Sequence, residues 1–130
     1  MKYEVRYYSR SGNVKAIAEA VAQELEVEAV SVDQPQALIT QTTDVLFIGG
    51  ALYAYGLDEH LKTYLNALDG SLIHKAVIFS STWISRHSIE LIRKALMDKG
   101  IETIEEAFYV RGKPSAEQLK QAKEFARKYR

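Results

Sequence analysis

The stretch Tyr8-Ser9-Arg10-Ser11-Gly12-Asn13-Val14-Lys15 joins two segments of different hydrophobic period. Residues 3–8 form an apolar run that is typical of a strand, whereas the apolar residues of 13–25 recur at helical spacing. The connection between them is short and polar. Unpaired backbone N–H groups at a helix start and the helix dipole both favour an anion. This strand–loop–helix junction is therefore a candidate phosphate-binding site.

The alternation of strand and helix patterns continues to the end of the chain. We expect further strands at 27–32, 44–49, 75–80 and 101–110, one helical turn around 37–39, and helices at 58–70, 88–99 and 115–129. The expected N-cap residues of these three helices are Asp58, Ser88 and Ser115, and Gly70 and Gly100 are expected to end the first two.

Short connections between alternating strands and helices predict a parallel sheet with right-handed crossovers and helices on both faces. We expect a three-layer, doubly wound α/β fold with a five-stranded parallel sheet in the order 2-1-3-4-5, as one domain over residues 1–130. In such a sheet the ligand crevice opens at the carboxyl ends of strands one and three, where the strand order reverses. The loops expected to carry function are therefore 9–13, 50–57 and 80–87.

Composition excludes several classes of function. The chain has no cysteine, which removes disulfides, thiolate nucleophiles and cysteine metal sites. Its 17 basic and 17 acidic residues balance, so charge does not indicate binding to nucleic acid or a membrane surface. No apolar run approaches the roughly 18 residues of a membrane span. The N-terminus lacks the apolar stretch of a signal peptide, and we expect a cytoplasmic protein. The three histidines show no metal-ligand spacing, so no metal site is expected.

Three loops, each at the end of an expected strand, resemble the cofactor loops of the flavodoxin family. Ser9-Arg10-Ser11-Gly12-Asn13-Val14 resembles the family's phosphate loop, Thr/Ser-x-Thr/Ser-Gly-x-Thr. Gly49-Gly50-Ala51-Leu52-Tyr53-Ala54-Tyr55-Gly56 resembles the flavin-flanking loop after strand three, and Ser80-Ser81-Thr82-Trp83 resembles the one after strand four. The resemblance covers the whole chain and is to the short-chain type, which lacks an insertion in the last strand.

The resemblance implies that the three loops bind FMN. The phosphate would be held by side-chain donors and by backbone that Gly12 allows to approach closely. Tyr53 and Trp83 are expected to cover the two faces of the flavin ring. At Val14 the family usually has a threonine, so one hydroxyl ligand is missing. The implied FMN contacts are Ser9, Arg10, Ser11, Gly12, Asn13, Val14, Ala51, Leu52, Tyr53, Ala54, Tyr55, Gly56, Ser81, Thr82 and Trp83.

Simpler interpretations of the same residues stay open. The first loop also fits an ordinary turn in which Asn13 or Ser11 caps the helix, and loop aromatic residues often pack on neighbouring helices. In the third loop, Arg86 and His87 stand where flavodoxins often carry acidic residues. Near the flavin they would raise its reduction potential, and alternatively they face solvent.

The function implied by the resemblance is electron transfer between a reductase and an acceptor, which would be redox partner proteins. FMN would supply the chemistry, and no side chain would act as a catalytic acid, base or nucleophile. Two alternatives remain. A flavin-dependent oxidoreductase using NAD(P)H, quinone or porphyrin is one, because porphyrin-oxidising relatives share the tyrosine-rich second loop. A flavin-free binding module of the same fold is the other, because of Val14 and the altered third loop.

Overall fold

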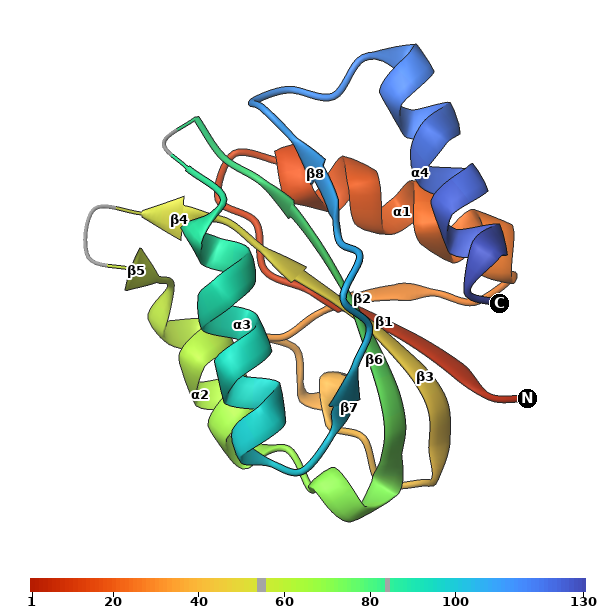
Figure 1. The fold of residues 1–130 in the computed structure, drawn as a ribbon, viewed down its shortest axis with the longest axis vertical. Helices are drawn as coiled ribbons and strands as arrows, with labels where there is room; N and C mark the ends of the chain where they lie inside the picture. The colour runs from red at the N-terminus through yellow and green to blue at the C-terminus, as the bar shows by residue number, and fades with distance from the viewer. Residues whose placement is uncertain (54–55, 84) are drawn as a thin grey trace.

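The structure is a computed structural model that describes residues 1–53, 56–83 and 85–130. Its elements follow the predicted alternation of strands and helices (Figure 1). In chain order they are β1 (Tyr3–Tyr7), α1 (Asn13–Leu25), β2 (Ala29–Ser31), the 3-10 turn Pro35–Ala37, β3 (Thr43–Gly50), β4 (Leu52–Tyr53), β5 (Gly56–Leu57), α2 (Glu59–Ala67), the 3-10 turn Gly70–Leu72, β6 (Ile73–Ser81), α3 (His87–Asp98), β7 (Glu102–Thr103), β8 (Phe108–Val110) and α4 (Ala116–Lys128).

The main sheet is parallel and has the order β2-β1-β3-β6-β7, with β8 also paired to β6. The two short strands β7 and β8 lie along one side of β6 and together occupy the last position of the sheet. The predicted order 2-1-3-4-5 is therefore confirmed, but the expected single strand 101–110 is interrupted. In the gap between β7 and β8, the Arg93 guanidinium on α3 donates to the carbonyl oxygens of Ile104 and Glu105, at 2.9 Å each. These carbonyls are thereby bonded to α3.

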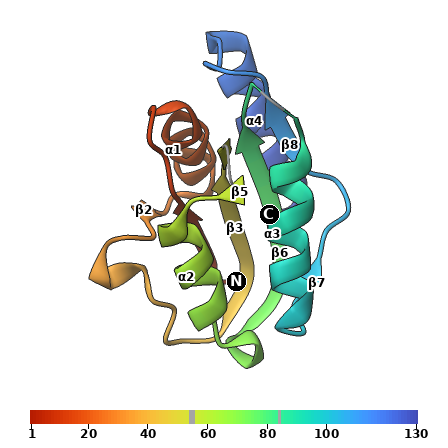
Figure 2. The ribbon, with the colours of Figure 1, turned by 90° about the vertical axis from the view of Figure 1, so that its left-hand side faces the viewer.

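Helices cover both faces of the sheet, as the predicted three layers require. Figure 1 shows α1 and α4 side by side on one face, and Figure 2 faces α2 and α3, which cover the other. Because successive strand residues point to opposite faces, neighbours on β3 enter different cores. Phe47 packs with α1 and α4, whereas Leu46 and Ile48 pack with α2 and α3, and all three are fully buried.

Three of the five predicted helix-end residues are confirmed. The Asp58 carboxylate accepts from the His60 backbone N–H at the start of α2, at 2.7 Å. Ser115 and Gln118 form a reciprocal capping box at the start of α4. Gly100 follows the end of α3 in the left-handed conformation, with φ of 76°, as expected of a residue that ends a helix.

Two other cap predictions are wrong. Ser88 lies inside α3, which begins at His87, and its buried hydroxyl shares a hydrogen bond of 2.7 Å with Ser80 Oγ. Gly70 does not end α2, which stops at Ala67, and instead begins a 3-10 turn. A Cβ at Gly70 would lie 1.9 Å from the Lys99 carbonyl oxygen, so glycine is needed there for close backbone approach.

Candidate functional site

The three predicted loops leave the sheet at the same edge. β1, β3 and β6 are parallel neighbours, so their carboxyl ends lie together (Figure 1). Two contacts hold these ends in place: Tyr8 N donates to Gly49 O at 3.2 Å, and Ser80 Oγ donates to Gly50 O at 2.6 Å. The strand order reverses here, since β1 has β2 on one side and β3 on the other. This edge is where an open α/β sheet presents its ligand crevice.

The first loop leaves the start of α1 open to an anion. Gly12, not Ser11 or Asn13, is the N-cap residue, with φ of 93° and no side-chain cap on the helix. A Cβ added at Gly12 would meet nothing within 4 Å, and no acidic residue lies in the first turn of α1. Ser9 Oγ accepts from Gly12 N at 3.0 Å, and Ser11 Oγ accepts from Asn13 N at 3.4 Å. The donor set and the open helix start fit a phosphate group.

Val14 has a structural role at this position. Its side chain is 2% exposed and belongs to the core between the sheet and α1. Only the backbone of Val14 can therefore face the loop. Its side chain contributes to the core and does not supply the hydroxyl that a threonine would offer at this position.

Arg10 reaches across the crevice instead of turning toward α1. Its Nε and Nη2 both donate to Asp58 Oδ2, at 2.9 and 2.6 Å. Its guanidinium carbon lies 3.8 Å from the ring centroid of Tyr53, a cation–π arrangement. Arg10 therefore ties the first loop to the second loop and to the start of α2.

Asp58 is the acceptor at the centre of this contact and is buried. Its Oδ1 accepts from the His60 backbone and lies 2.9 Å from His60 Nδ1, while the His60 ring stacks on Tyr8. Burial acts to raise the pKa of Asp58, but the hydrogen bonds from Arg10 and His60 outweigh it, and the pKa lies below its ordinary value. From the sequence, Asp58 is recognisable only as a helix cap, because nothing local pairs it with Arg10.

The second loop contains a short antiparallel hairpin that was expected only as a loop. β4 and β5 pair Leu52 with Leu57 and Tyr53 with Gly56, whose φ is 107°. The hairpin places the Tyr53 ring, which is half-buried, against Arg10. Burial raises the pKa of the Tyr53 phenol, although Arg10 opposes the shift. The predicted contacts Ala54 and Tyr55 lie outside the described residues.

The third loop presents an exposed tryptophan on a buried base. Ser81 is buried and donates to Gly112 O at 2.5 Å, and the Thr82 carbonyl accepts from Tyr109 Oη at 3.0 Å. Trp83 is 68% exposed, and its ring lies against Gly112, where an added Cβ would fall 2.1 Å from Trp83 Cζ2. The loop therefore holds a large, flat and exposed apolar surface beside the turn that follows β8.

Arg86 and His87 are both exposed, which agrees with the alternative that they face solvent. The Arg86 guanidinium lies 5.3 Å from the ring centroid of Tyr109 on β8. The arginine that contacts a predicted flavin-flanking residue is therefore Arg10, not Arg86.

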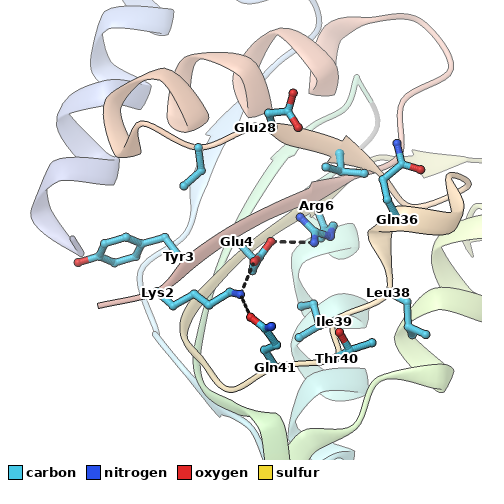
Figure 3. Close-up of a pocket in the computed structure, with 12 residues that line it drawn as sticks. Lys2, Tyr3, Glu4, Arg6, Glu28, Gln36, Leu38, Ile39, Thr40 and Gln41 are labelled. Atoms are coloured by element: carbon cyan, nitrogen blue, oxygen red, sulfur yellow. Dashed lines mark hydrogen bonds and ion pairs between the residues drawn. The ribbon is translucent and has the colours of Figure 1, made fainter.

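A hollow of about 420 Å³ lies at the opposite end of the sheet (Figure 3). It is bordered by the start of β1 and by the segment that leads into β3. Its most buried charge, Arg6, is already paired with Glu4 at 2.7 Å and donates to the Ala37 and Val5 carbonyls. No residue of the three loops lines this hollow, so it is not the predicted site.

Comparisons with known structures agree with this fold. Flavodoxin 1 from Bacillus cereus is similar over 99% of this chain and 97% of its own, with 20% identity and a TM-score of 0.82. A flavodoxin from the domain Archaea has 21% identity and a TM-score of 0.81, over 97% of this chain and 94% of its own. Two-electron reduced Megasphaera elsdenii flavodoxin has 22% identity and a TM-score of 0.75, over 97% and 98%.

No helix in the described part of the chain is long and apolar enough to cross a membrane.

The family is established by a separate comparison. No curated protein sequence matches the chain significantly. The model of the flavodoxin domain, however, matches residues 5–127. The chain therefore belongs to the flavodoxin family of FMN-binding electron-transfer proteins.

Proposed function

We propose that this protein is a single-domain electron carrier that holds one FMN at the carboxyl edge of its sheet and passes electrons from a reductase to an acceptor. The observation that carries the proposal is the meeting of three elements at one edge. These are the uncapped start of α1, the Tyr53 hairpin and the exposed Trp83. An anion seat beside two aromatic surfaces matches a phosphorylated, planar cofactor.

In this proposal the first loop binds the phosphate. Backbone N–H groups at the start of α1 donate to it. The hydroxyls of Ser9 and Ser11, whose oxygens now accept from the Gly12 and Asn13 backbone, donate their own protons to phosphate oxygens. Neutral donors then hold the dianion together with the helix dipole, because Arg10 is already paired with Asp58.

The second and third loops flank the flavin ring. Tyr53 and Trp83 supply flat apolar cover, which orients the ring and excludes water from it. The FMN itself supplies the redox chemistry when bound. The remaining contacts proposed here are the backbone of Arg10 and Val14 together with Gly12, Asn13, Ala51, Leu52, Ala54, Tyr55, Gly56, Ser81 and Thr82.

Two measurements test the proposal. First, FMN is titrated into the apoprotein while the emission of Trp83, the only tryptophan, is followed. Saturable quenching at micromolar FMN is expected, and its absence would favour a flavin-free binding module.

Second, the reconstituted protein is mixed with NADPH and cytochrome c, with and without an added flavodoxin reductase. We expect cytochrome reduction only when the reductase is present. Rapid NADPH oxidation without it would contradict the carrier role and favour a flavin-dependent oxidoreductase.

A further inference from the structure

We infer that the ion pair between Arg10 and Asp58 persists beside bound FMN and that its two charges act on the flavin reduction potential in opposite directions, the arginine raising it and the aspartate lowering it. This inference rests on the proposed function. It assigns to the pair a role in tuning the flavin and not in binding its phosphate.

The pair is held in place from the Asp58 side. The Asp58 side chain is 7% exposed, whereas that of Arg10 is 54% exposed. One carboxylate oxygen of Asp58 accepts two bonds from Arg10, and the other accepts the N-cap bond from His60. If a ligand displaced Arg10, a buried carboxylate would lose its main cationic partner, and such losses are strongly destabilising. The favourable arrangement keeps the pair and places the flavin elsewhere.

The position of Arg10 on Tyr53 determines which face of the tyrosine is left for the flavin ring. The guanidinium covers one face of the tyrosine ring at 3.8 Å. The other face is then the one that can stack on a flavin ring, at a centroid distance of at least about 4.5 Å. The charge of Arg10 would thus lie roughly 8 Å from the flavin, which is within the Debye length of about 10 Å at 0.1 M salt. Asp58 Oδ2 lies 2.6 Å from Arg10 Nη2, so the aspartate charge also acts on the flavin from nearby.

The sign of each effect follows from the charge of the reduced flavin. Two electrons and one proton convert neutral oxidised flavin into a reduced form with one negative charge. A nearby cation stabilises that form and a nearby carboxylate destabilises it. In the intact pair the two effects largely cancel, so removing either charge exposes the other.

Asp58→Asn and Arg10→Gln test this directly. Asparagine is as good an N-cap residue as aspartate, so Asp58→Asn removes the charge and keeps the cap of α2. The potential is measured spectrophotometrically against a reference dye at fixed pH and ionic strength. We expect Asp58→Asn to raise the ratio of reduced to oxidised flavin about tenfold at a given potential, and Arg10→Gln to lower it about tenfold. Tenfold corresponds to about 30 mV for a two-electron couple.

A matched control comes from another arginine–carboxylate pair. Arg127 makes two hydrogen bonds to Glu24, at 3.1 and 3.0 Å, and joins α4 to the end of α1, away from the crevice. Glu24→Gln should leave the potential unchanged. The double variant of Arg10 and Asp58 should return close to the wild-type value.

Arg10→Lys separates charge from shape. It keeps the positive charge but loses the forked geometry of the guanidinium, so its potential should lie nearer to wild type than that of Arg10→Gln. Equal potentials for these two variants would overturn the inference, as would shifts of the same sign in Asp58→Asn and Arg10→Gln. If the wild-type protein binds no FMN at all, the proposed function itself fails, and apoprotein unfolding curves show whether any variant has merely failed to fold.

Discussion

Gly112→Ala perturbs the candidate site at the residue against which the Trp83 ring lies. Gly112 has φ of 71°, and an added Cβ would lie 2.1 Å from Trp83 Cζ2 and 2.5 Å from Cε2. Real Cβ atoms do not approach a neighbour that closely, so the indole ring must leave its present position. Trp83 is largely exposed and is free to swing outward.

The expected magnitudes follow from backbone strain and stacking. An alanine with positive φ costs about 1–2 kcal/mol, and the more restricted unfolded chain offsets about 0.4–1 kcal/mol of that. We therefore expect Gly112→Ala to lower the free energy of unfolding by about 1 kcal/mol. Moving Trp83 off its base should also remove its stacking on FMN, worth about 0.5–1.5 kcal/mol. That loss corresponds to roughly two- to tenfold weaker FMN binding.

Gly100→Ala is the matched control. Gly100 has a similar φ of 76°, but a Cβ there would meet nothing within 4 Å. Both variants should lose similar stability in urea unfolding, while only Gly112→Ala should make Trp83 more accessible to acrylamide quenching and weaken FMN binding. Equal FMN affinity in the two variants would refute the placement of Trp83 on the flavin.

Three further predictions concern the scaffold. Ser115→Ala removes the capping box of α4 and should lower the free energy of unfolding by about 1 kcal/mol in urea. Phe47→Ala, at a fully buried position, should lower it by about 3–5 kcal/mol, and a loss below 1 kcal/mol would contradict the described core. Burial raises the pKa of Tyr64 to about 12, and its hydroxyl donates to the Ala37 carbonyl at 2.6 Å. The raised pKa means that the folded state favours the protonated phenol. The stabilisation that Tyr64 gives the folded state is therefore complete below pH 10 and is lost as the pH rises toward 12. Tyr64→Phe should show a smaller loss of stability over that range, as measured by urea unfolding at each pH.

Much of the fold was predictable because its signals are local. Hydrophobic period separates 3–8 from 13–25, and the structure places β1 and α1 at Tyr3–Tyr7 and Asn13–Leu25. The strand order was predicted from the alternation of elements, right-handed crossovers and the fit of five strands to the doubly wound order 2-1-3-4-5. The capping box at Ser115 is likewise contained within four residues.

The predictions that failed depend on contacts between distant residues. Ser88 looked like a cap, but the buried Ser80 hydroxyl, on the neighbouring strand, holds it inside α3. The last strand is broken because Arg93, on α3, takes two of its carbonyl groups. Neither partner can be inferred from the local pattern.

The same reason explains what was missed at the site. Arg10 and Asp58 are 48 residues apart, and their pairing appears only when the first loop and the start of α2 are placed at one sheet edge. Gly112 accepts the Ser81 hydrogen bond through its carbonyl and lies against the Trp83 ring, and neither contact can be inferred from the local sequence. Motif similarity located the loops, and the fold determined which of their side chains are already paired.

The most direct test of the account compares FMN with riboflavin in calorimetric titrations of the apoprotein. The two ligands share the flavin ring, and only FMN carries the phosphate that the start of α1 is proposed to hold. We predict one FMN per chain, bound at least tenfold more tightly than riboflavin. Equal binding of the two ligands would contradict the phosphate site, and binding of neither would contradict the central claim that this edge of the sheet holds a flavin.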